Sequence, residues 1–107
     1  MVGFDIDKTI QSSAYLLKLT NGRSNYMRLL KLLYLAERLS LQNRKSPISG
    51  DRPIAMERGP VPSRTLDMIK GHDPKASQWD AYFSRDNYDI LLDDDPGNLA
   101  LSRAELK

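Results

Sequence analysis

The chain reads YMRLLKLLYLAERLSLQ over residues 26–42. Wound into a helix, this stretch is apolar around most of its circumference. Its polar side chains form one narrow stripe of Arg28, Lys31, Arg38 and Gln42. A helix that is apolar nearly all round is typical of the buried centre of a bundle. The sequence therefore predicts a central core helix that begins near Ser24 as its N-cap and includes Leu33 and Tyr34 in the core.

Two shorter helices are expected on either side of this central one. Before it, from Asp5 or Asp7 to about Thr20, apolar residues recur at helical spacing at Ile6, Ile10, Ala14 and Leu17. Asn21 and Gly22 then supply a stop. After it, a helix is expected to begin at Pro62 or Ser63, because proline fits the first helical turn, and to end at Gly71.

The remaining segments predict a small β element. Four prolines and two glycines break any helix over residues 43–63, where Ile48 and residues 54–56 are expected to form two very short strands around a turn at 49–51. Residues 88–92 read as a strand that residues 99–101 could join, after a short helix containing Trp79, Tyr82 and Phe83. The predicted fold class is mainly α (α+β): a small helical bundle around a central apolar helix, with a short β-hairpin.

The sequence ends in a helix-start signal. Ser102-Arg103-Ala104-Glu105 is a capping box, yet only five residues follow Ser102. We therefore expect residues 1–107 to form one domain that is incomplete after Ser102, or that a partner completes.

Composition and charge exclude several classes of protein. The chain has no cysteine and one histidine, so it has neither a disulfide framework nor the usual zinc cage. No apolar run approaches the ~20 residues of a membrane helix, and the N-terminus has no basic segment of a secretory signal. These features predict a cytoplasmic protein. The net charge of +2 divides into a basic part, residues 1–75, and an acidic part, residues 76–107.

Candidate catalytic and metal-binding groups are few. His72 lies near Asp67 and Asp73, but no second imidazole or thiol accompanies it, so a solvated turn is the better interpretation. Consecutive carboxylates at residues 93–95 lack the alternating spacing of a calcium loop. Phosphate binding at residues 59–62 is disfavoured because two prolines remove two N–H donors. We expect no enzymatic activity, no cofactor and no metal.

Nucleic-acid binding is a stronger alternative. Nine basic and three acidic residues lie between Arg23 and Arg64, and such a patch could contact phosphates. The helix that carries many of these charges is mostly apolar, however, which makes it a poor reader of a DNA groove.

Three ordered motifs resemble a known family. They are residues 30–38 (LKLLYLAER), residues 47–52 (PISGDR) and residues 55–63 (AMERGPVPS). In this order and at these separations they resemble the Panacea domain, the SocA-like antitoxin family, over about residues 4–71. The resemblance over residues 72–107 is weak.

The resemblance implies a bacterial or phage antitoxin that neutralises a cognate protein toxin by direct protein binding. It also leaves open a proteolytic adaptor that delivers the toxin to a protease, or a DNA-binding autoregulator. A stiff proline- and glycine-containing segment flanked by arginines suits a preorganised docking ridge. The residues predicted to contact the partner or to shape the ridge are Arg38, Asp51, Arg52, Met56, Arg58, Gly59, Pro60, Val61 and Pro62. For Asp51 and Arg52 the alternative is a pair that braces the turn.

Overall fold

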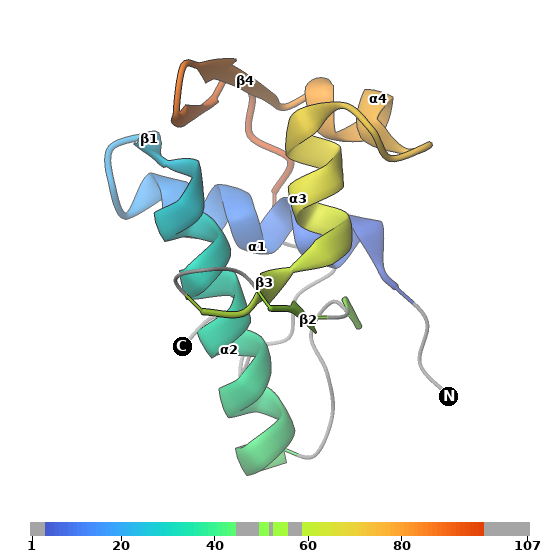
Figure 1. Ribbon diagram of the computed structural model, residues 1–107. Helices are drawn as coiled ribbons and strands as arrows, with labels where there is room; N and C mark the ends of the chain where they lie inside the picture. Colours follow the sequence, from blue (N-terminus) through green and yellow to red (C-terminus); the bar gives the residue numbers. More distant parts are fainter. Residues whose placement is uncertain (1–3, 45–49, 52, 56–58, 98–107) are drawn as a thin grey trace.

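The computed structural model describes residues 4–44, 50–51, 53–55 and 59–97 (Figure 1). Over these residues the fold is α+β, as predicted, with helices and short antiparallel strands in one domain. The elements in chain order are α1 (Ile6–Lys18), β1 (Arg23–Asn25), α2 (Tyr26–Arg44), β2 (Pro53–Ile54), β3 (Val61–Pro62), α3 (Ser63–Lys70), α4 (Ala76–Asp80), β4 (Phe83–Asp86) and β5 (Asp89–Leu92).

The first helix forms as its periodicity predicts. Asp5 is its N-cap, and the Asp5 carboxylate accepts a hydrogen bond of 3.1 Å from the Lys8 backbone N–H. The predicted apolar face is buried along its length. After Lys18 the backbone turns through left-handed conformations at Asn21 and Gly22, and the Gly22 N–H donates to the Leu17 carbonyl over 2.7 Å.

The prediction that Ser24 caps the central helix is wrong. Ser24 lies in β1, opposite Ile90 of β5, and α2 begins at Tyr26. Asn25 caps the helix instead, because its side-chain oxygen accepts from the backbone N–H groups of Met27 at 2.9 Å and Arg28 at 3.3 Å.

One sheet has the order β1-β5-β4, all antiparallel, so the predicted strand at residues 88–92 is confirmed as β5. Its expected partner at residues 99–101 lies outside the described residues. The partners found are β1 and β4. Phe83 was expected in the short helix with Trp79, but α4 ends at Asp80 and Phe83 begins β4, where it pairs with Leu92.

Of the predicted hairpin strands around residues 49–51, only the second lies among the described residues. Residues 53 and 54 do form a strand, but β2 pairs with β3, with Ile54 opposite Val61. Ile48 lies outside the described residues. Residues 50 and 51 lie outside the strands, and the Asp51 side chain is bonded to the start of α3.

The third helix is confirmed at Ser63–Lys70. It ends at Gly71, whose φ of 80° lies in the left-handed region that glycine adopts freely. The His72 N–H closes the helix end on the Asp67 carbonyl at 2.8 Å.

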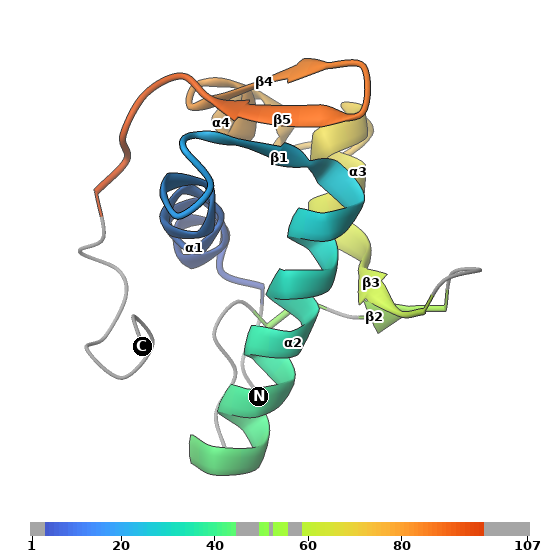
Figure 2. The same cartoon turned by 90° about the vertical axis from the view of Figure 1, so that its left-hand side faces the viewer.

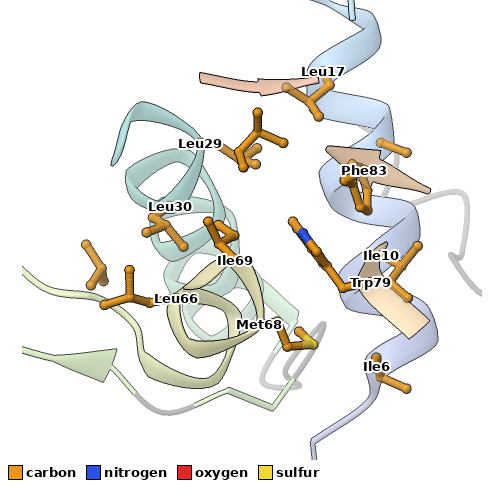
Figure 3. Close-up of a cluster of buried hydrophobic side chains, with 13 residues drawn as sticks. Ile6, Ile10, Leu17, Leu29, Leu30, Leu66, Met68, Ile69, Trp79 and Phe83 are labelled. Atoms are coloured by element: carbon orange, nitrogen blue, oxygen red, sulfur yellow. The ribbon is translucent and has the colours of Figure 1, made fainter. Parts of the chain in front are cut away.

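The core lies between α1, the first half of α2, α3, α4 and the three-stranded sheet. Trp79 lies between side chains of α1 and α3 and stacks on Phe83 with ring centroids 4.1 Å apart (Figure 3). Leu29 and Leu30 of α2 are 1% and 0% exposed. The second half of α2 extends beyond this core (Figures 1 and 2), so the prediction of a core helix along residues 26–42 is wrong for that half.

Candidate functional site

The structure places six of the nine predicted site residues. Arg52, Met56 and Arg58 lie outside the described residues, so their positions stay predictions. The other six lie on the second half of α2 or on the segment that enters α3. The list is Arg38, Asp51, Gly59, Pro60, Val61 and Pro62.

Asp51 links this segment to α3. One carboxylate oxygen accepts from the Arg64 N–H at 3.0 Å, and the other accepts from the Thr65 N–H at 2.9 Å and the Thr65 hydroxyl at 2.8 Å. Pro62 occupies the N-cap position of α3 and makes no side-chain capping bond. Asp51 therefore caps the N-terminus of α3 although it is not adjacent to α3 in the sequence. In this way it braces the segment that enters the helix.

Glu37 anchors the same segment to α2. Its carboxylate accepts a hydrogen bond of 3.1 Å from the Gly50 backbone N–H. Because Glu37 holds residue 50 and Asp51 holds the start of α3, residues 50–51 are tied at both sides. The chain is thereby fixed next to α2.

The segment before α3 passes from exposed to buried along the chain. Pro60 is exposed, and Gly59 has a φ of 115° that disfavours any residue with a side chain. Val61 is 0% exposed, and Pro62 is also buried. Val61 and Pro62 therefore support this surface segment through buried contacts, while Pro60 is accessible to a partner.

A hollow of about 230 Å³ separates α2 from this segment. It brings three predicted residues, Arg38, Asp51 and Pro62, to one place. Its lining is Leu33, Tyr34, Glu37, Arg38, Leu41, Asp51 and Pro62. We call this feature the α2 hollow.

Leu33 and Tyr34 were expected in the core, but both are half-buried and line the α2 hollow. Leu33 also packs against the core cluster. The lining therefore combines apolar side chains with three charged ones, Glu37, Arg38 and Asp51, which we call the rim.

Arg38 provides the positive charge of the rim. Its side chain is exposed, and within the described part of the chain it makes no hydrogen bond or ion pair. Glu37 and Asp51, by contrast, are bonded within the fold. The rim thus presents a guanidinium that can bind a carboxylate of a partner.

Leucines on the second half of α2 were missed by sequence reasoning. Leu35, Leu39 and Leu41 are 50%, 56% and 48% exposed. The apolar excess of residues 26–42 could have indicated these exposed leucines, because a helix packed on one side needs only one apolar face.

Asp73, outside the α2 hollow, is engaged in a structural contact. Asp73 accepts from the Arg64 guanidinium at 3.1 Å, and this hydrogen bond lowers the pKa of Asp73. The same guanidinium lies 4.2 Å from the centre of the Phe4 ring. His72 is exposed, and the residues with described positions contain no group of three or more His, Cys, Asp or Glu that could hold a metal ion.

None of the helices in the described part of the chain has the length and apolar character needed to cross a membrane.

These features define a small α+β domain with a braced, partly apolar surface at one end of its longest helix. The chain belongs to the family of SocA-like antitoxins with a Panacea domain, whose sequence model matches residues 29–107. The match begins within α2 and includes residues 72–107, where the motifs alone give only a weak resemblance. No curated protein and no solved structure matches the chain.

Proposed function

We propose that this protein is an antitoxin that neutralises a cognate protein toxin by binding it directly, with the α2 hollow and the segment before α3 as the docking surface. The observation that carries the proposal is the α2 hollow, which combines apolar lining residues with an arginine that has no ion-pair partner among the described residues, in a member of an antitoxin family. Neutralisation would then be by occlusion of the toxin's working site.

Rigidity supports this assignment of the surface. The bonds from Glu37 to Gly50 and from Asp51 to Thr65 fix the wall of the hollow before any partner arrives. A preformed surface loses less conformational entropy on binding than a mobile one. The proposed docking surface is therefore built for tight association rather than for turnover.

The predicted residues divide into two roles under this proposal. Arg38 and Pro60 contact the toxin, because both are exposed at the surface. Asp51, Gly59, Val61 and Pro62 shape the ridge through a cap, a turn and buried contacts. Arg52, Met56 and Arg58 are retained as proposed contacts on the same segment of sequence.

The test is co-expression with the product of the neighbouring reading frame. We expect that product to be lethal alone, harmless with this protein, and to co-purify with it. Leu41→Glu places a charge in the apolar lining of the hollow and should abolish both protection and co-purification. Leu19→Glu, at a leucine that is 68% exposed at the end of α1, is the matched control and should leave both intact.

Each alternative gives a different result. Loss of the toxin from cells only while a protease is active would indicate a proteolytic adaptor. Protection without co-purification, with promoter binding that weakens steeply as salt rises, would indicate an autoregulator. If Leu41→Glu protects as well as the wild type, the docking surface lies elsewhere.

A further inference from the structure

The outer face of α2, turned away from the core, carries three leucines at regular spacing, followed by a glutamine. Leu32, Leu35, Leu39 and Gln42 follow one another at separations of three, four and three residues. This is the a/d spacing of a helix that packs lengthwise against another helix. We call this row the α2 seam, and it lies on a different side of the helix from most of the α2 hollow.

The α2 seam is open to a partner. Leu35 and Leu39 are 50% and 56% exposed, Gln42 is exposed, and Leu32 is half-buried. A second hollow, of about 350 Å³, extends this face toward the start of the helix, between Met27 and Leu32. The second half of α2 also projects from the described fold, so a helix could lie along it without meeting the sheet (Figure 2).

Basic side chains flank the α2 seam on one side. Lys31 and Arg38 are seven residues apart and occupy the same flanking position in successive heptads, and Arg28 continues the row of the seam itself. Within the described part of the chain, none of these three side chains forms an ion pair or a side-chain hydrogen bond. Flanking charges of this kind select the partner and its orientation.

A second copy of this protein does not supply the complement. Antiparallel pairing of two α2 helices places these flanking lysines and arginines against one another, which is repulsive. Parallel pairing places Lys31 and Arg38 opposite Ala36 and Asn43, which carry no charge. The protein's own residues 98–107 contain Arg103, Glu105 and Lys107, so their side chains offer no net negative charge to Lys31 and Arg38.

We infer that the α2 seam binds an amphipathic helix of another protein, with apolar residues at its own a and d positions and Asp or Glu opposite Lys31 and Arg38. The juxtaposition of exposed a/d leucines with a basic flank that forms no ion pair among the described residues carries this inference. It specifies the chemistry of a partner helix and holds whether or not that partner is a toxin, so it can fail while the antitoxin function stands.

The test uses two synthetic peptides of three heptads with the same leucine seam. One has glutamate at every flanking position and the other has lysine. Titrated into labelled full-length protein at low salt, the glutamate peptide should bind at least about tenfold more tightly than the lysine peptide, the scale of a good charge complement at an interface. That preference should shrink as salt is raised.

Two variants localise the binding. The double substitution Lys31→Glu with Arg38→Glu should reverse the preference between the peptides. The double substitution Leu35→Ser with Leu39→Ser should weaken binding of the glutamate peptide by about tenfold or more, with the circular dichroism spectrum and melting temperature unchanged. Leu19→Ser is the control and should bind like the wild type.

Three results would overturn the inference. The first is equal binding of the two peptides, or binding of neither. The second is sedimentation that shows a dimer which Leu35→Ser with Leu39→Ser dissociates, because a second copy would then occupy the seam. The third is tighter peptide binding after Leu101→Ser with Leu106→Ser, because the protein's own last residues would then compete for it.

Discussion

The two halves of α2 are similarly rich in leucine, but the first half is buried in the core and the second half is exposed. Leu29 and Leu30, in the first half, are 1% and 0% exposed, while Leu35 and Leu39, in the second, are 50% and 56% exposed. The first half is covered by α1, α3 and the sheet, and the second half projects past them (Figure 1). An apolar residue on a helix therefore does not by itself indicate core, because burial depends on which elements pack against that turn.

Because they differ in burial, the two halves of α2 have different functions. The first half supplies the contacts that hold the domain together. The second half carries apolar area beyond what the described fold uses, next to Arg38, whose side chain has no ion-pair partner in the described part of the chain. Contiguous exposed apolar residues with a polar rim are typical of protein-binding surfaces.

The largest expected effect is on stability in the first half. Leu30→Ala should lower the free energy of unfolding by about 2–5 kcal/mol, because it leaves a cavity at a fully buried site. Leu39→Ala, the matched change in the second half, should shift it by no more than about 0.5 kcal/mol. Urea unfolding followed by circular dichroism measures both. Similar losses in the two variants would abolish the distinction between the halves.

A smaller loss of stability is expected at Asp51, whose hydrogen bonds brace the wall of the α2 hollow. Asp51→Ala should lower the free energy of unfolding by about 1–2 kcal/mol, because the Arg64 and Thr65 N–H groups at the start of α3 lose their acceptor. Asp51→Asn keeps one oxygen and should lose less. Hydrogen exchange should quicken at the start of α3. An Asp51→Ala protein that unfolds like the wild type would argue that Asp51 is not a brace.

The ion pair of Asp73 with Arg64 predicts a pH dependence remote from α2. Because Arg64 holds the pKa of Asp73 below its usual range, the pair stabilises the fold above the unfolded value of about 3.9, and this stabilisation is lost as pH falls through the folded value. Arg64 is 39% exposed, so solvent screening limits the contribution to about 1 kcal/mol. Asp73→Asn should be less stable than the wild type at pH 7 and equal to it near pH 2. A constant difference across this range would contradict the assignment.

The smallest effect is expected at His72. Its side chain is exposed in the turn after α3, so His72→Ala should leave both toxin protection and the melting temperature unchanged. Loss of protection with normal folding would place a functional group outside α2 and the segment that precedes α3.

Local signals predicted the elements better than their pairing. The helix over Ile6–Lys18 and the stop at Gly71 follow from periodicity and from a left-handed residue, which neighbouring residues determine. The pairing of β1 with β5 joins residues more than sixty positions apart, and no local pattern encodes it. No local pattern encodes the pairing of Ile54 with Val61 either.

The candidate site was predictable only in part for the same reason. The motifs selected Arg38 and Asp51, which the structure places around one hollow. They did not reveal that Asp51 caps α3 or that Leu35, Leu39 and Leu41 are exposed. Both facts depend on which distant segments pack next to α2.

The most direct test of the division of α2 is hydrogen–deuterium exchange of the full-length protein alone and in complex with the product of the neighbouring reading frame. We predict slower exchange on binding across residues 35–42, while residues 29–30, already protected by the core, do not change. Unchanged exchange over residues 35–42, with new protection confined to the β4–β5 hairpin, would contradict it.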